Sequence, residues 1–142
     1  INPVILLPET LSREAAKTAS TLAASITLGV GQFCTNPGLL IALEDDALRI
    51  FIGALSMEIQ KVLPATMLHQ GIAENYAQKL KQALAQKGVI VEGQSSVSGN
   101  PAQGMPLVAS VSAATFLANP TLAEEVFGPF SLIVKCKDIH EL

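Results

Sequence analysis

No charged residue lies between Lys17 and Glu44, and this uncharged run constrains the fold more than any other feature of the sequence. A protein in water has to bury most of such a stretch, and a chain of 142 residues can form one domain with a substantial core. Gly31-Gln32 and Asn36-Pro37 interrupt the run well short of the ~20 apolar residues that a membrane-spanning helix needs. We therefore expect a buried helix, a tight turn and a buried strand, and no membrane partner.

The composition is that of a folded protein without affinity for nucleic acid. Hydrophobic residues make up 49% of the chain and charged residues 15%, which excludes an intrinsically disordered protein. The net charge of −3 provides no basic surface for a nucleic acid. Two cysteines, Cys34 and Cys136, form no dense disulfide framework, which predicts a reducing, cytoplasmic location. The chain begins at Ile1, inside an apolar run and without Met, so we expect it to be part of a longer protein.

Short apolar runs alternate with helical patterns along the whole chain. Ser12 is predicted to cap the first helix and Asp46 the second, which should end at Pro64. Residues 93–104 are expected to form a loop, and a last helix should open at Asp138. The alternation predicts an α/β fold with helices flanking a sheet. Strands are expected at 3–7, 38–43, 89–91, 107–111 and 130–135, and helices at 12–30, 46–62, 73–87 and 113–117.

The turn inside the uncharged run holds Cys34 among small, turn-prone residues, in the segment Gly31 to Gly38. From the residues alone, this thiol is either a nucleophile offered at the edge of a cleft or a buried apolar filler. Cys136 lies in an expected strand and is predicted to be structural. His69 and His140 have no partner at ligand spacing, and no metal site is expected, including at the acidic residues 44–46.

Two segments resemble motifs of the aldehyde dehydrogenase superfamily. Residues 31–38, Gly-Gln-Phe-Cys-Thr-Asn-Pro-Gly, are similar to its nucleophile motif, and residues 124–129, Glu-Glu-Val-Phe-Gly-Pro, to a second motif that follows in the same order. The resemblance covers essentially the whole chain. It implies a layered α/β catalytic domain of aldehyde dehydrogenase type, incomplete at both ends, with residues 1–142 as one part of it and the nucleotide-binding domain absent. Details of residues 1–4 and 33–36 are most similar to NADP-preferring 2,5-dioxovalerate (α-ketoglutarate semialdehyde) dehydrogenases.

The resemblance implies a role for three residues. Cys34 would attack a small-molecule aldehyde to give a thiohemiacetal, hydride would pass to NADP or NAD, and water would hydrolyse the resulting thioester to the acid. The backbone N–H of Cys34 would be one oxyanion donor. Glu125 would hold the nicotinamide ribose, and Phe127 would pack near the nicotinamide ring. The family's homo-oligomers imply a dimer or a tetramer for the complete enzyme.

Other parts of the family's site do not match any residue of this chain. The resemblance places the family's general-base glutamate and an oxyanion asparagine before Ile1, so the isolated chain is expected to be catalytically inert. Two alternatives remain open. One is an acylating enzyme in which coenzyme A or phosphate resolves the thioester, and the other is a non-catalytic α/β module of the same fold.

Overall fold

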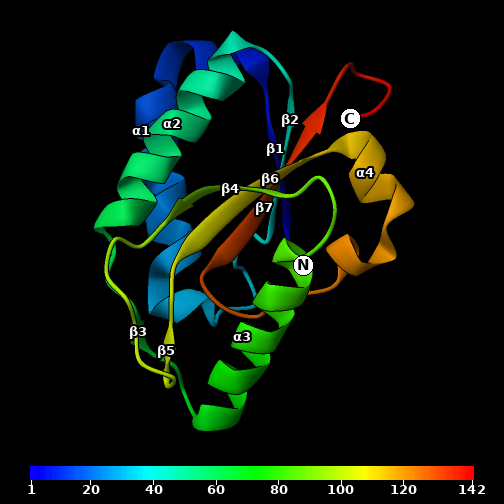
Figure 1. Cartoon of the computed structure of the whole chain (residues 1–142). Coiled ribbons are helices and arrows are strands. Elements are labelled where there is room, and N and C mark those ends of the chain that lie inside the picture. The colour runs from blue at the N-terminus through cyan, green and yellow to red at the C-terminus, as the bar shows by residue number, and fades with distance from the viewer.

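A computed structural model describes all 142 residues, and it confirms the predicted α/β fold with helices flanking a sheet. Five strands form the main sheet and two more form a small ribbon (Figure 1). Two short 3-10 turns, Leu28–Gly31 and Pro120–Ala123, precede the segments that resemble the family motifs. The other elements are β1 Pro3–Leu6, α1 Pro8–Thr27, β2 Leu39–Leu43, α2 Asp46–Lys61, β3 Ala65–Thr66, α3 Gln70–Leu84, β4 Ile90–Gln94, β5 Gln103–Gly104, β6 Leu107–Ser112, α4 Ala113–Ala118 and β7 Phe130–Cys136.

The last strand of the chain lies in the middle of the sheet. The strand order is β1-β2-β7-β6-β4, with parallel pairing throughout except between β4 and β6. Because β2 and β7 are parallel neighbours, the segments that lead into them meet at the same edge of the sheet. The turn with Cys34 leads into β2, and residues 124–129 lead into β7. The topology therefore brings the two motif-like segments together.

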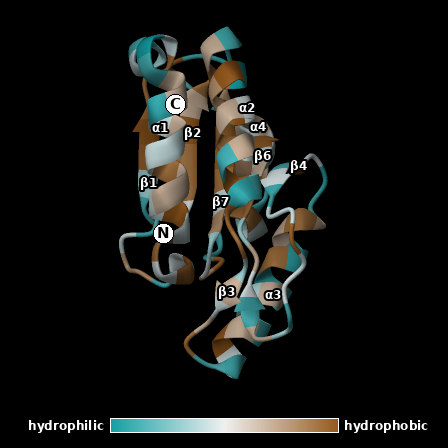
Figure 2. Cartoon of the chain, turned by 90° about the vertical axis from the view of Figure 1, so that its left-hand side faces the viewer, coloured by the Kyte–Doolittle hydropathy of each residue, from teal (hydrophilic) through white to brown (hydrophobic).

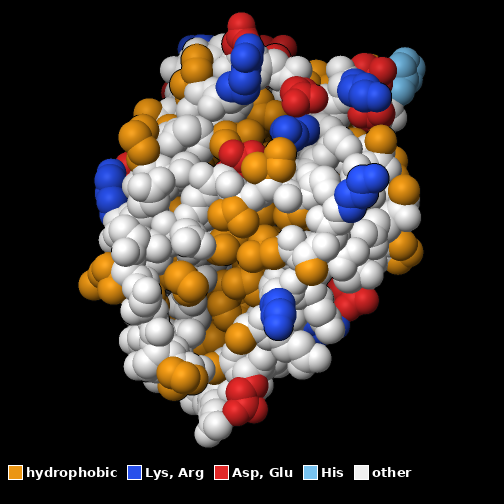
Figure 3. All heavy atoms as spheres, in the orientation of Figure 1, with side chains coloured by type: hydrophobic (Ala, Val, Ile, Leu, Met, Phe, Trp, Pro, Cys, Tyr) orange, Lys and Arg blue, Asp and Glu red, His pale blue; other side chains and the backbone are white.

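Helices cover both faces of the sheet and create two apolar clusters. Leu40, Val108 and Ile133 face α1 and α2, whereas Leu107, Leu132 and Val134 lie in the cluster formed with α3 and α4. Because both faces of the sheet are covered, β6 and β7 are buried along almost their whole length, and their apolar residues do not alternate with exposed polar ones. Figure 2 shows α1 and α2 side by side over the sheet. In Figure 3, orange side chains run along the middle of the opposite face, which α3 and α4 cover only in part.

The first helix begins earlier than the sequence predicts. Leu7, in an extended conformation, is the N-cap, and Pro8 is the first helical residue. Proline suits this position because its φ is already helical and its missing N–H would have no partner there. The prediction of Ser12 as the cap is wrong, since its hydroxyl donates to Pro8 O (2.8 Å) within the helix. None of the helices has the length and apolarity required to cross a bilayer.

The cap of α2 is displaced by one residue from its predicted position. Asp45, not Asp46, accepts a hydrogen bond from Leu48 N (2.7 Å). Asp46 lies in the first turn and pairs with Arg49. Adjacent aspartates are equivalent in the sequence pattern, and only the extended backbone of Asp45 decides between them. The helix ends at Lys61, before Pro64.

Two further predictions of local structure need correction. Residues 93–104 are not wholly a loop, because β4 extends to Gln94 and β5 pairs antiparallel with β3. Two-residue strands are too short to leave a periodic signal in the sequence. Asp138 opens a hydrogen-bonded turn rather than a helix, with its Oδ1 accepting from His140 N (2.8 Å) and Glu141 N (3.1 Å).

Candidate active site

After α1, the uncharged run forms a left-handed turn of three residues. Gly29, Val30 and Gly31 have φ values of 54°, 58° and 65°. Glycine adopts this conformation freely, but a β-branched residue loses about 1–2 kcal/mol in it. Val30 therefore keeps this conformation because its surroundings hold it, and its side chain packs against the apolar cluster beneath α3. The turn redirects the chain from α1 toward Cys34.

Cys34 and Cys136 occupy opposite environments. Cys34 is exposed, so the alternative that it is a buried apolar filler is wrong. Cys136 is 1% exposed at the end of β7, as expected for a structural cysteine. Burial, followed by the negative charges of Glu141 and Asp138, raises the pKa of the Cys136 thiol and keeps it protonated. Only Cys34 offers its sulfur to another molecule.

The loop that carries Cys34 is anchored from the N-terminal side by Asn2. The Asn2 Nδ2 donates to the carbonyl oxygen of Cys34 and to that of Asn36 (3.3 Å). Within the loop, Asn36 N donates to Phe33 O (3.0 Å), and Gly38 N donates to Asn36 O (2.9 Å). The backbone of residues 33–38 is therefore a closed turn with an external support.

Residues 31–38 are docked directly onto the segment that precedes β7. The Asn36 Nδ2 donates to Gly128 O (2.9 Å), and the buried Ser131 hydroxyl donates to Pro37 O (2.5 Å). Gly31 lies so close that a Cβ built on it would be 2.2 Å from Gly128 C and O. Glycine at position 31 thus permits both the left-handed turn and the contact between the two backbones.

A small cavity of about 30 Å³ lies where these segments meet. Its lining includes Phe33 and Asn36 from the cysteine loop and Glu125 and Phe127 from the other segment. The Glu125 carboxylate is exposed, whereas Phe127 is half-buried. The structure therefore brings Glu125 and Phe127 to one pocket with the residue that precedes Cys34.

An ion pair that the sequence does not predict joins α3 to the beginning of residues 124–129. Lys79 of α3 donates to the carboxylate of Glu124, the neighbour of Glu125. The two residues are 45 positions apart, and only the docking of α3 beside Pro120–Ala123 brings them together.

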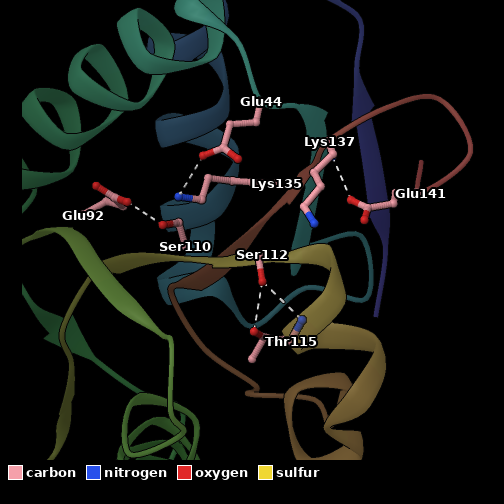
Figure 4. Close-up of polar contacts among 8 residues, drawn as sticks. All are labelled: Glu44, Glu92, Ser110, Ser112, Thr115, Lys135, Lys137 and Glu141. Atoms are coloured by element: carbon pink, nitrogen blue, oxygen red, sulfur yellow. Dashed lines mark hydrogen bonds and ion pairs between the residues drawn. The ribbon is translucent and has the colours of Figure 1, made fainter.

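A separate polar cluster lies near the carboxyl ends of β2 and β7, whereas the turn with Cys34 lies near the amino end of β2 (Figure 4). Lys135 of β7 pairs with Glu44 after β2 (3.5 Å), and Ser110 of β6 donates to Glu92 of β4. No group of three or more possible metal ligands occurs in the chain. The acidic residues 44–46 are instead engaged individually in one ion pair to Lys135, one helix cap and one ion pair to Arg49.

Sequence comparison finds relatives that match the whole chain. It is 39% identical over 142 residues to alpha-ketoglutaric semialdehyde dehydrogenase 2 of Azospirillum brasilense, covering 100% of this chain and 27% of that protein. It is 36% identical over 141 residues to alpha-ketoglutaric semialdehyde dehydrogenase of Acinetobacter baylyi, covering 97% of this chain and 26% of that protein. The chain thus spans about a quarter of the length of these curated relatives. No model of a known protein family matches it.

Solved structures share the fold at much lower sequence identity. The chain matches gamma-glutamyl-gamma-aminobutyraldehyde dehydrogenase of Burkholderia cenocepacia with a TM-score of 0.75 and 19% identity, over 99% of this chain and 29% of that one. It matches methylmalonate-semialdehyde dehydrogenase of Oceanimonas doudoroffii with a TM-score of 0.77 and 15% identity, over 99% of this chain and 30% of that one. These sequence relatives and these solved structures all carry the names of aldehyde dehydrogenases, and the chain is similar to a part of them that is about a quarter of the length of the curated relatives.

Proposed function

We propose that this chain carries the nucleophile and part of the cofactor site of an enzyme that oxidises an aldehyde to a carboxylic acid with NAD(P) as the hydride acceptor. One observation carries the proposal. An exposed thiol, Cys34, lies in a glycine-rich turn that is docked onto the segment with Glu125 and Phe127. A structural cysteine needs neither exposure nor such a docked partner segment.

In the proposed reaction, the Cys34 sulfur bonds to the aldehyde carbon and the carbonyl oxygen becomes an oxyanion. The backbone N–H of Cys34 donates no hydrogen bond within the chain, so it is free to stabilise this oxyanion. Loss of hydride from the same carbon gives a thioester, and attack by water releases the acid and returns the thiol. The water needs a general base, and we propose that a residue outside this chain provides it.

The residues at the pocket fit part of a nicotinamide cofactor. The exposed Glu125 carboxylate is a suitable acceptor for the two hydroxyls of a ribose, as acidic residues are in other dinucleotide sites. The half-buried Phe127 ring offers an apolar surface to a planar ring beside it. Lys79 neutralises Glu124, which leaves the charge of Glu125 available for the ligand. When bound, the cofactor supplies the hydride acceptor.

We further propose 2,5-dioxovalerate, or a similar semialdehyde, as the substrate and NADP as the preferred cofactor. The names of the relatives from Azospirillum and Acinetobacter support the substrate class. Residues 1–142 would then be one part of the catalytic domain of a longer, homo-oligomeric cytoplasmic enzyme, and the isolated chain would be inert. The acylating reaction is the alternative, and it differs only in the acceptor that resolves the thioester.

The test is reduction of NADP and NAD by the complete enzyme with a panel of aldehydes that includes 2,5-dioxovalerate. We expect NADPH formation that Cys34→Ala abolishes and Cys136→Ala preserves. Acid as the product supports hydrolysis, whereas an acyl-coenzyme A formed only with coenzyme A present indicates the acylating reaction. Activity that survives Cys34→Ala contradicts the assignment of the nucleophile. Absence of activity with every aldehyde and both cofactors would favour the non-catalytic module.

A further inference from the structure

Asn36 links the two loops of the candidate site, and the proposed reaction gives it no role. It lies two residues after Cys34, and its Nδ2 donates to Gly128 O (2.9 Å), 92 positions later in the chain. Gly128 directly follows Phe127. The hydrogen bond therefore connects the loop of the proposed nucleophile to the segment that carries both proposed cofactor contacts.

The Asn36 side chain makes only this one hydrogen bond with the protein. Its Oδ1 is buried and accepts none. A buried amide oxygen without a donor costs free energy, so packing alone would favour an apolar side chain at this position. The donation to Gly128 is thus the one favourable polar interaction that an asparagine brings here.

The local shape of the cysteine loop does not depend on the Asn36 side chain. The backbone N–H of Asn36 donates to Phe33 O (3.0 Å), and its carbonyl accepts from Gly38 N (2.9 Å) and from Asn2 Nδ2 (3.3 Å). These bonds persist when the side chain is changed. Substitution at position 36 therefore removes the hydrogen bond to Gly128 and leaves the turn itself closed, while the Gly31–Gly128 contact and the Ser131–Pro37 hydrogen bond keep the two segments packed together.

We propose that Asn36 is a positioning residue that fixes the Cys34 sulfur relative to Glu125 and Phe127. The proposal rests on the function proposed above. Hydride transfer needs a distance of about 3–3.5 Å between the acceptor ring and the substrate carbon that is bonded to the Cys34 sulfur. A shift of about 1 Å in this distance can lower the rate about 100-fold. The Asn36–Gly128 hydrogen bond joins the two loops whose relative position sets this separation.

The experiment compares Asn36→Ala and Asn36→Asp with the wild-type complete enzyme. We expect kcat to fall by roughly 10- to 100-fold in both at pH 8, with less than about a threefold change in the KM for the aldehyde. The rate at which iodoacetamide alkylates Cys34 should stay within about threefold of the wild-type rate, because the thiol stays exposed. Asn100→Ala, in the loop between β4 and β5, is the control and should behave like the wild type.

Asn36→Asp gives a readout that a merely structural role would not produce. An ionised carboxylate cannot donate to Gly128 O, but a protonated carboxyl group can. Burial and the neighbouring carbonyl oxygen should raise the pKa of this carboxyl group above its usual value of about 3.9. The ratio of variant to wild-type kcat should therefore rise as the pH falls from 8 to 5 for Asn36→Asp and stay constant for Asn36→Ala.

Three outcomes would overturn the proposal. Variants with the wild-type kcat would show that the link does not control the reaction. Activity that falls only with the melting temperature, with the same pH-independent ratio in both variants, would show a purely structural role. A wild-type enzyme without aldehyde-dependent reduction of NAD(P) would refute the proposed function itself and this proposal with it.

Discussion

Gly31 and Gly128 meet backbone to backbone, with 2.2 Å between a Cβ built on Gly31 and the carbonyl carbon and oxygen of Gly128. The contact joins segments that are far apart in the sequence and adjacent at the sheet edge, because β2 and β7 are parallel neighbours. The two motif-like segments are thus parts of one packed unit.

We predict that Gly31→Ala destabilises the protein by about 3 kcal/mol, because the new methyl group meets the Gly128 backbone and alanine disfavours the φ of 65°. Urea unfolding followed by circular dichroism measures the change. Gly53→Ala is the matched control. Gly53 lies in α2 with nothing within 4 Å of the added Cβ, so the substitution should stabilise the helix by about 0.5–1 kcal/mol. Equal effects of the two substitutions would contradict the described contact.

The two thiols should differ in reactivity. Cys34 is exposed and Cys136 is 1% exposed with a raised pKa, so a disulfide reagent should modify one thiol rapidly in the native protein. Cys34→Ala should remove the rapid phase of modification, and unfolding in urea should make Cys136 accessible to the reagent. Rapid modification that persists in Cys34→Ala would show that β7 does not protect Cys136.

The corrected helix cap gives a direct comparison of adjacent residues. Asp45→Ala should cost about 1 kcal/mol of unfolding free energy, because Leu48 N loses its acceptor. Asp46→Ala should cost less, since its ion pair with Arg49 is largely exposed to solvent. Thermal unfolding of both variants shows which one loses more stability. A larger loss of stability in Asp46→Ala would indicate that Asp46 is the cap, as the sequence predicts.

Tyr76 should make stability depend on alkaline pH. It is 2% exposed, its hydroxyl donates to Met105 O (2.6 Å), and burial raises the pKa of its phenol well above the usual value of about 10. Above about pH 10 the phenol of the unfolded chain loses its proton, whereas the phenol of the folded protein keeps it. The stabilisation is therefore complete below about pH 10 and is lost as the pH rises, by about 1.4 kcal/mol per unit.

The control for this prediction is Tyr76→Phe, which lacks the titrating group. Urea unfolding at several pH values from 8 to 11 should show a shallower decline in this variant above pH 10. Cys136→Ala should remove a separate decline that begins at lower pH, since burial also raises the pKa of that thiol. An unchanged slope in Tyr76→Phe would place the origin of the alkaline sensitivity elsewhere.

Many features of the fold could be predicted from the sequence because they depend on neighbouring residues. The apolar stripes of α2 and α3, the apolar run Leu132-Ile133-Val134 of β7 and the glycine turn after α1 are all local patterns. The errors concern competing local choices, as between Ser12 and Leu7 or between Asp45 and Asp46. The β3–β5 ribbon was missed because two-residue strands have no periodicity.

The sequence by itself determined the types of residues at the candidate site: a cysteine among glycines, and a second segment with Glu125 and Phe127. Only the tertiary structure decided that Cys34 is exposed, that Lys79 engages Glu124, and that Asn36 bonds to Gly128. The physical reason is the position of β7 between β2 and β6. Strand order depends on packing across the whole sheet, and no local pattern in either segment encodes it.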